Sequence, residues 1–232
     1  MFGPRLYHAD DYAIGQLYLD LYERDRDPAK IEPLRNLFSI IKHNPPQDSL
    51  TFEFVRGKGD VTGKEYTYIP CQSRWCWADA LFMGPPVWIQ LAEVTGDRTY
   101  LDYADKEFWA TVDKLWDKDD HLFFRDSTFF DKREPNGQKV IWARGVGWVS
   151  AGMARILEHL PKDHPRRAEY ETIFRTMMTR LAAQQTWQSN GVRATSCSFT
   201  PTGSTSGSTI ARTPTRSTSC RVVPRSRAGL VR

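Results

Sequence analysis

Residues 71–86, with the sequence CQSRWCWADALFMGPP, combine a single carboxylate with several aromatic side chains. If this segment is helical, Trp75 and Met83 lie four residues on either side of Asp79 and share its face. A buried carboxylate must be paired or have a function, because burial of an unpaired charge is costly. Apolar surroundings also raise the pKa of a carboxyl, which then holds a proton near neutral pH. Asp79 is therefore a candidate general acid, and the competing interpretation is a structural carboxylate paired with Arg74 or another base.

The sequence IWARGVGW places Arg144 between Trp142 and Trp148. Arginine can bind a carboxylate through two parallel hydrogen bonds, and tryptophan offers a flat face to a sugar ring. Gly145 and Gly147 would let a backbone or a ligand approach closely. The pattern predicts contacts with an acidic sugar. The alternative is a loop–helix junction with buried tryptophans and a salt-bridged arginine.

Two acids, Asp10 and Asp11, precede the first helical pattern. At a helix start such residues usually cap free backbone N–H groups and interact favourably with the helix dipole. The sequence has no Gly-x-Ser-x-Gly, His-Glu-x-x-His or Walker motif, and the glycines beside Arg144 do not follow the dinucleotide-binding pattern. These motif searches therefore identify no nucleophile elbow, phosphate loop or zinc-protease helix.

The four cysteines, Cys71, Cys76, Cys197 and Cys220, are too few for a disulfide framework in a chain of 232 residues. Cys71 and Cys76 are five positions apart, which is not the spacing of a zinc knuckle, and no histidine lies at ligand spacing. We therefore expect ordinary buried or free thiols and no metal site.

Apolar periodicity predicts that helices position these candidate residues. The expected helices span residues 10–24, 28–43, 73–95, 98–116, 146–160 and 165–185. Their order is helix, short turn, helix, long loop, repeated, and only TFEFV and YTYI resemble short strands. This order indicates an all-α array of helical hairpins whose long loops, and hence whose site, lie at one end.

The spacing of apolar residues also predicts which helix faces are buried. The predicted apolar faces are Ile14, Leu17 and Leu21 in the first helix, and Ile31, Leu34, Phe38 and Ile41 in the second. The third helix contains Gly84-Pro85-Pro86, which must break or kink it.

Charge is distributed unevenly along the chain. Residues 187–232 hold seven of the 32 basic residues, all of them arginine, and none of the 28 acidic ones. Residues 1–186 therefore carry 25 basic and 28 acidic side chains, so the overall charge of +4 does not indicate a nucleic-acid-binding domain. The last segment also holds nine serines and eight threonines without an apolar period. We predict a domain over residues 1–186 and a tail over residues 187–232 that is disordered or out of frame.

No run of about 18 apolar residues occurs, so we expect no membrane-spanning helix. The first ten residues lack a basic region followed by an apolar core, and the absence of a signal peptide slightly favours a cytoplasmic location. We expect neither a membrane nor a nucleic acid as a partner, and the sequence leaves the oligomeric state open.

The motifs taken together resemble a known enzyme family. The run SRWCWADALFMGPPVWIQLAEVTGD, followed by YLDYADKEFWATVDKLWD, HLFFRDS and WARGVGW, closely resembles the unsaturated glycuronyl hydrolases. More narrowly, residues 8–186 resemble glycoside hydrolase family 105, the unsaturated rhamnogalacturonyl hydrolases, which are related to family 88. The resemblance implies an (α/α)6 barrel of six helical hairpins. Only about half of its helices are predicted here, so we expect a partial barrel that is incomplete at both ends.

The resemblance also implies a reaction and two catalytic acids. Such enzymes remove a terminal 4,5-unsaturated uronic acid from the oligosaccharides that polysaccharide lyases produce. An aspartate at the position of Asp79 protonates C4 of the enol ether and then activates water for attack at C5. Asp11, four residues before Gly15, matches the second acid, which assists or orients. The expected partner is an unsaturated uronyl oligosaccharide, and no metal or organic cofactor is implied.

The same resemblance implies the substrate contacts. Arg144 would face the substrate carboxylate. The remaining substrate-binding candidates are Trp75, Trp77, Met83, Arg125, Trp142 and Trp148. Two positions depart from the family pattern, since Arg125 stands where many relatives have histidine and Val146 where the family usually has asparagine. These departures suggest a subgroup with different contacts.

Three alternatives stay open at this point. One is a catalytically inactive carbohydrate-binding fragment of such an enzyme. Another is a different (α/α)6 enzyme such as a sugar epimerase, although the five histidines do not show the pairing that it would need. The third is nucleic-acid binding by the arginine-containing tail, although arginine without aromatic residues is a weak signal for it.

Overall fold

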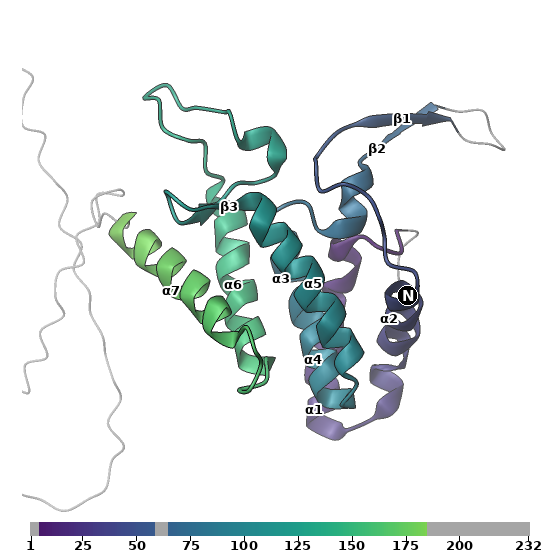
Figure 1. The fold of residues 1–232 in the computed structure, drawn as a ribbon. Helices are drawn as coiled ribbons and strands as arrows, with labels where there is room; N and C mark the ends of the chain where they lie inside the picture. The colour runs from purple at the N-terminus through teal and green to yellow at the C-terminus, as the bar shows by residue number, and fades with distance from the viewer. Residues whose placement is uncertain (1–4, 59–64, 185–232) are drawn as a thin grey trace, which may run out of the picture. The chain divides into compact units, whose positions relative to one another are not determined.

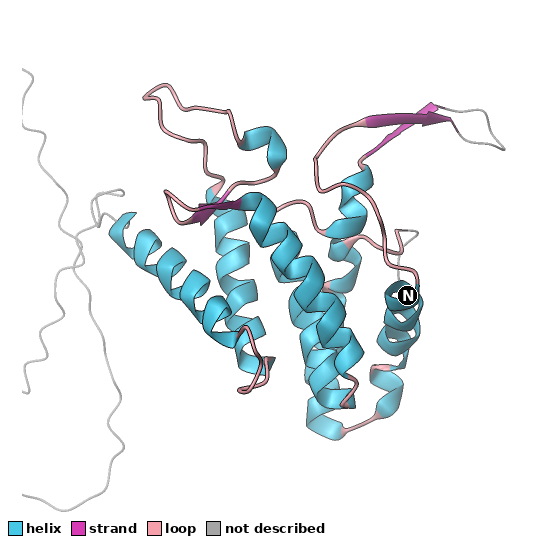
Figure 2. Ribbon diagram, in the orientation of Figure 1, coloured by secondary structure: helices cyan, strands magenta, loops and turns pink. Residues whose placement is uncertain are grey.

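The computed structural model describes residues 5–58 and 65–184, and the described chain is mostly helical (Figures 1 and 2). The α-helices are α1 (Ile14–Asp25), α2 (Glu32–His43), α3 (Ala80–Met83), α4 (Pro85–Thr95), α5 (Arg98–Leu115), α6 (Ala143–His159) and α7 (Arg167–Gln184). Short 3-10 helices are η1 (Ala9–Tyr12), η2 (Pro28–Lys30), η3 (Pro70–Arg74) and η4 (Ser127–Phe129). The strands form two antiparallel pairs, β1 (Val55–Lys58) with β2 (Glu65–Tyr68) and β3 (Trp116–Asp117) with β4 (Leu122–Phe123). The predicted all-α hairpin array is confirmed.

Helix α4 is the centre of the bundle. It contacts α5 as its hairpin partner, and it also packs against α1 and α6. Its residues from Pro85 to Ala92 are all buried, as expected for a helix that is covered on every side. In the core of the bundle, Trp88 of α4 stacks on Phe38 of α2 with ring centroids 3.9 Å apart, and on Tyr103 of α5 with ring centroids 4.2 Å apart. These aromatic contacts hold the first and second hairpins together.

The predicted apolar face of the second helix is confirmed, but that of the first is wrong. Ile14 and Leu17 of α1 are 45% and 50% exposed, whereas Gly15 and Leu19 are buried. The reason is a close approach between helices, since a Cβ added at Gly15 would lie 2.6 Å from Val87 Cγ1. Because Gly15 has no side chain, its face of α1 can approach α4 closely and packs against it. The larger apolar residues Ile14 and Leu17 therefore stay exposed.

The third predicted helix is also different from the observed chain. Residues 70–95 form η3, a turn and the two helices α3 and α4 instead of one helix broken at Gly84. Trp75 ends η3 in the left-handed conformation, with φ of 54°, and its indole packs against Gly84, where a Cβ would lie 2.8 Å from the ring. A disulfide joins Cys71 to Cys76 across this turn. The expectation of free thiols at these two positions is therefore wrong.

Long loops gather at one end of the bundle, as the sequence predicts. Figure 1 shows the β1–β2 hairpin and the loop between β4 and α6 at that end. Of the two short strands expected, the one at residues 66–69 corresponds to β2, whereas the one at residues 51–55 overlaps β1 only at Val55. Within the described residues, no helix is long and apolar enough to cross a membrane. The predicted tail, residues 187–232, lies outside the described part of the chain.

Candidate active site

Asp79 lies directly before α3, at its N-terminal end. The N–H of the preceding residue, Ala78, donates a 2.8 Å hydrogen bond to the carbonyl oxygen of Arg125, which ties the loop after β4 to this position. The side chain of Asp79 is half-buried, and its Oδ1 atom is buried without a hydrogen-bond partner among the described residues. An unpaired buried oxygen is expected where a carboxyl must exchange a proton with a ligand.

Burial raises the pKa of Asp79 above its ordinary value, and the negative charge of Asp10 raises it further. The residue's own backbone N–H and the guanidinium groups of Arg125 and Arg144 act in the opposite direction, but they do not outweigh burial. The raised pKa favours the protonated carboxyl, which is the form that a general acid needs. The charges of Asp10, Arg125 and Arg144 therefore all act on this carboxyl.

Arg74 does not neutralise Asp79, although it is close in sequence. Its Nε lies 2.9 Å from Glu107 Oε2, and its Nη2 lies 3.3 Å from Glu107 Oε1. Glu107 is fully buried, so its carboxylate requires the positive charge of Arg74 as a partner. The alternative interpretation of Asp79 as the structural partner of Arg74 is therefore wrong.

Two guanidinium groups lie close to the ring of Trp142. The Arg144 guanidinium carbon is 4.6 Å from the centroid of the Trp142 ring, and that of Arg125 is 5.5 Å away. Arg144 is exposed on the first turn of α6 and pairs with no carboxylate in the described part of the chain, so the salt-bridge alternative for it is wrong. Arg125 forms a 2.5 Å ion pair with the fully buried Asp126. Together these side chains form a cationic, aromatic surface that suits an acidic sugar.

The two acids near the N-terminus have different surroundings. Asp11 Oδ1 accepts a 2.6 Å hydrogen bond from Arg5 Nη2, and its other oxygen is buried without a partner among the described residues. Asp10 raises the pKa of Asp79, whereas Asp11 is not among the groups that do so. Neither acid caps α1. Instead, His8 Nδ1 accepts a hydrogen bond from the backbone N–H of Asp10 and caps η1.

Sequence reasoning therefore missed Asp10 and His8. The sequence pattern predicts Asp10 only as a helix cap and indicates no role for His8. The His8 ring lies 4.9 Å from the Trp77 ring, and burial lowers its pKa, so that His8 is neutral near pH 7. The signal that could have found these residues is the dense sequence HADD directly before a helix.

The tryptophans of the residue 71–86 segment are mostly structural. Trp75 is 1% exposed, packs edge-on against Tyr103 and accepts a hydrogen bond from Thr111 through its carbonyl oxygen. It therefore belongs to the core and does not line a sugar site, contrary to the prediction. The left-handed turn at this residue also separates it from the face of α3 that follows Asp79.

The other predicted contacts, Trp77, Met83 and Trp148, lie on or pack against the segment that contains Asp79. Trp77, two residues before it, is 6% exposed and packs on His8. Met83 and Trp148 are half-buried, and the Trp148 ring lies 4.8 Å from that of Phe82 on α3. Trp148 thus joins α6 to the short helix after Asp79.

Comparisons with known proteins support the resemblance. The family model for Glycosyl Hydrolase Family 88 matches residues 2–210. A protein of Alteromonas sp. strain LOR named unsaturated 3S-rhamnoglycuronyl hydrolase is 44% identical over 181 residues, which cover 78% of this chain and 43% of that protein. A protein of the same name from Formosa agariphila is 34% identical over 189 residues, covering 78% and 47%. The chain thus spans less than half the length of these relatives.

A solved structure shows the same fold. A glycosyl hydrolase family 88 protein from Bacteroides vulgatus superposes with a TM-score of 0.63 at 28% identity, over 78% of this chain and 45% of that one. The three hairpins α1–α2, α4–α5 and α6–α7 therefore correspond to part of a six-hairpin (α/α)6 toroid.

Proposed function

Because the chain belongs to glycosyl hydrolase family 88, we propose that it carries the catalytic site of an enzyme acting on the products of polysaccharide lyases. The enzyme removes a terminal 4,5-unsaturated uronic acid by hydration of the double bond. The observation that carries this proposal is Asp79, a half-buried carboxyl with an unpaired oxygen and a raised pKa beside two arginines.

Asp79 performs both proton transfers in this mechanism. Its protonated carboxyl gives a proton to C4 of the enol ether, which leaves positive charge at C5 and the ring oxygen. The resulting carboxylate then takes a proton from water as the water oxygen bonds to C5. The hemiketal opens, releasing the neighbouring sugar and a keto-uronate, and Asp79 ends in its protonated state. Since no bond to the anomeric carbon is displaced, the spacing rule for paired glycosidase carboxylates does not apply.

Arg144 binds the carboxylate of the uronic acid, and Trp142 and Trp148 provide the walls of the subsite. Arg144 fits this role because it is exposed, carries no competing salt bridge in the described structure and stacks on Trp142. The charge of Asp10 raises the pKa of Asp79, and Asp11 assists or orients as the second acid.

The substrate class is that given by the names of the two curated relatives, a 3S-rhamnoglycuronyl group. We read this as an unsaturated uronate linked to a rhamnose that carries a sulfate. Such a disaccharide has two anionic groups, and the site has two guanidinium groups, of Arg125 and Arg144, close to the ring of Trp142. The pair is therefore suited to a doubly anionic ligand.

The reaction in isotopically labelled water tests the proposal. The substrate is the unsaturated disaccharide, and the proteins are the 232-residue chain and a chimera in which residues 1–184 replace the matching segment of the Alteromonas relative. We expect loss of the ultraviolet absorbance of the double bond, deuterium at C4 and solvent oxygen at C5 of the product. Solvent oxygen at the anomeric carbon, with the double bond kept, would contradict hydration.

A carbohydrate-binding fragment without activity is the second candidate. The observation in its favour is that the chain spans less than half the length of its relatives. Saturable binding of the disaccharide by the 232-residue chain, together with turnover only in the chimera, would identify the chain by itself as such a fragment.

A further inference from the structure

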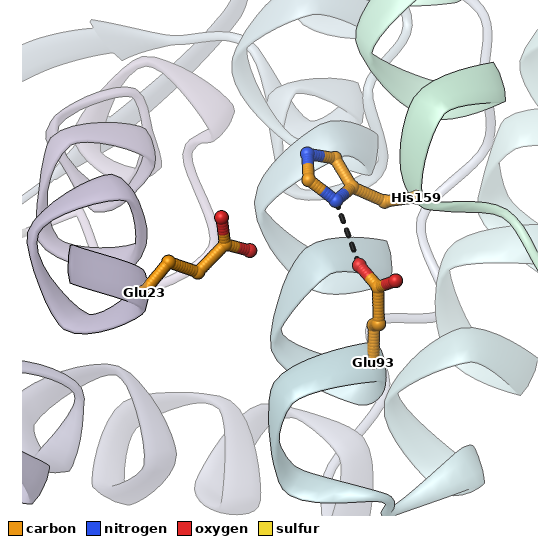
Figure 3. Close-up of side chains that lie close together, drawn as sticks. All are labelled: Glu23, Glu93 and His159. Carbon is orange, nitrogen blue, oxygen red and sulfur yellow. Dashed lines mark hydrogen bonds and ion pairs between the residues drawn. The ribbon is translucent and has the colours of Figure 1, made fainter. Parts of the chain in front are cut away.

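Three side chains from three helices converge away from the candidate active site. They are Glu23 on α1, Glu93 on α4 and His159 on α6, and one ligand atom of each lies within 4.8 Å of the other two. Figure 3 shows Glu23 pointing toward the pair that the other two form, in which His159 Nδ1 is 2.7 Å from Glu93 Oε2. We propose that these residues bind a divalent transition-metal ion, and that Zn²⁺ suits them best.

The donor set suits this ion. One imidazole nitrogen and two carboxylate oxygens are common zinc ligands, at about 2.0–2.2 Å from the metal. Two ligands of a tetrahedral ion with such bonds lie roughly 3.4 Å apart. The observed separations are all within 4.8 Å, so a small rotation of a long glutamate side chain is enough to close the site. Imidazole in place of a third carboxylate favours zinc over Mg²⁺.

The electrostatic environment also favours a cation. In the described part of the chain, no lysine or arginine forms an ion pair with Glu23 or Glu93. Arg155 is the nearby guanidinium on α6, and it pairs instead with Asp20, at 2.9 Å. In addition α1, α4 and α6 all end close to this group, and the free carbonyl groups of helix C-termini carry partial negative charge.

A buried amide gives independent support. Gln90 lies one turn before Glu93 on α4 and is fully buried. Its Nε2 donates hydrogen bonds to Glu23 Oε1 at 3.1 Å and to Asp20 Oδ1 at 3.3 Å, so its amide group contacts the cluster. Its Oε1 has no hydrogen-bond partner among the described residues, which is costly for a buried carbonyl. A half-turn of the amide would exchange the two hydrogen bonds of Nε2 for a bond from Oε1 to the metal, which would then have a fourth ligand.

The second nitrogen of His159 is also placed as in metal-binding histidines. Its Nε2 lies 4.0 Å from Glu158 Oε2. A histidine that binds a metal through one nitrogen usually directs the other N–H to a carboxylate, which fixes the ring. Glu158 can fill this role after a small movement.

The site is structural and not catalytic. Arg144 and His159 lie near opposite ends of α6, a helix of 17 residues, which corresponds to about 25 Å. The ion would therefore clamp the three neighbouring helices α1, α4 and α6 at the end far from Asp79. Sequence spacing could not reveal it, because Glu93 and His159 are 66 positions apart.

Zinc titration of the 232-residue chain tests the proposal. Zinc chloride is titrated by calorimetry in a Cys197→Ser/Cys220→Ser background, so that these two thiols do not contribute. We expect one zinc per chain, and at least about tenfold weaker binding in His159→Gln. The matched control is His43→Gln, since His43 also ends a helix, α2, but forms no ion pair with a carboxylate in the described structure. This control should bind zinc as the background chain does.

A second variant guards against a loss of folding. Glu23→Gln leaves the hydrogen bond between Glu93 and His159 intact, and circular dichroism should show an unchanged helix content. Zinc should raise the Tm of the background chain and of His43→Gln, but not that of Glu23→Gln. Absence of one-site zinc binding, equal zinc affinity in His159→Gln and His43→Gln, or equally tight binding of Mg²⁺ would overturn the proposal.

Discussion

The charged residues of the site change the pKa of the Asp79 carboxyl. Burial raises its pKa, the charge of Asp10 adds to this effect, and Arg125 and Arg144 oppose it. Because these contributions have known signs, single substitutions should move the pKa of Asp79 in opposite directions. The site can therefore be examined through the pH dependence of the rate as well as through loss of activity.

Removal of the charge at Asp10 should make Asp79 more acidic. Asp79 acts first in its protonated form, so activity falls as the pH rises through its pKa. Asp10→Asn removes a contribution that raises this pKa, and the alkaline limb of kcat/KM should therefore move to lower pH. The measurement is a pH–rate profile of the chimera, and a shift to higher pH would be inconsistent with this arrangement.

Asp11→Asn is the matched control for that experiment. Asp11 forms an ion pair with Arg5, which offsets its charge, and it is not among the main causes of the raised pKa of Asp79. We expect its substitution to leave the position of the alkaline limb unchanged, even if the rate falls. If Asp11→Asn shifts the limb and Asp10→Asn does not, Asp11 is the acid that acts on Asp79.

Arg144→Lys should weaken substrate binding while keeping the positive charge. Lysine cannot form the two parallel hydrogen bonds of a guanidinium, and the expected loss is about 1–3 kcal/mol. A substrate amidated at C6 should bind less well than the acid to the wild-type protein, but the difference should be much smaller in Arg144→Lys. Arg98→Lys, at an exposed position on α5, serves as the control. Equal discrimination by wild type and Arg144→Lys would show that Arg144 does not contact the carboxylate.

The sequence predicts some site residues and misplaces others for physical reasons. Asp79 and Arg144 stand out because a carboxylate and a guanidinium among aromatic residues need an explanation wherever the chain goes. Trp75 is misplaced because the prediction assumes a continuous helix, whereas a left-handed turn directs its ring into the core. The effect of Asp10 depends on its distance from Asp79, which no local pattern contains.

At the scale of elements, α3 is positioned by its close contact with α6. Gly152 of α6 faces the backbone of α3, and a Cβ there would lie 2.4 Å from the carbonyl oxygen of Leu81 and 2.8 Å from Phe82 Cα. Backbone atoms cannot move aside as a flexible side chain can. Gly152 therefore allows the two helices to approach and fixes the position of Asp79 at the start of α3.

Gly152→Ala should destabilise the protein by about 1–3 kcal/mol, because the added methyl group forces α3 and α6 apart. Gly147→Ala is the control on the same helix, since a Cβ there meets no described atom within 4 Å. The control should be neutral or stabilising by up to about 1 kcal/mol, since alanine favours a helix. Urea unfolding measures both. Equal stability of the two variants would mean that α3 and α6 can separate without cost.

The disulfide between Cys71 and Cys76 should stabilise the turn before Asp79. Both residues are fully buried, and the loop that they close is short, so the expected contribution is about 2 kcal/mol. A reducing agent should lower the urea midpoint of the wild type but not that of Cys71→Ala/Cys76→Ala. Cys197→Ala/Cys220→Ala should respond as the wild type does, and loss of the response in this control would assign the effect to the other cysteines.

Elements are predicted well where local residues determine their boundaries and faces, and poorly where contacts with distant residues do. Helix α5 is predicted well because the capping residue Asp97 precedes a regular apolar period. Helix α2 also has a regular apolar period, and it follows the 3-10 helix η2, which Asp27 caps. The buried face of α1 is not predicted well, because it is determined by the close approach of Gly15 to Val87 of α4, a helix that is distant in the sequence. The conformation of residues 70–83 is also not predicted well, because a disulfide and a tertiary contact to Gly84 determine the backbone there.

At the scale of the whole molecule, the chain carries the charged and aromatic groups of the proposed site on three hairpins of an (α/α)6 toroid. Its net charge is divided between residues 1–186, at −3, and the arginine-containing segment 187–232. The site's own positive charge comes from Arg125 and Arg144, so binding of the anionic disaccharide should not depend on that segment. Equal affinity of the chimera, which lacks residues 185–232, and of the 232-residue chain would agree with this assignment.

Turnover by Asp79→Asn in the chimera tests the central claim most directly. Asparagine keeps the shape of the side chain but has no proton to transfer, so kcat should fall by about a thousandfold with the thermal stability unchanged. Asp102→Asn, at an exposed position on α5, should retain the activity of the unsubstituted chimera. A rate in Asp79→Asn close to that of Asp102→Asn would contradict the assignment of Asp79 as the proton donor.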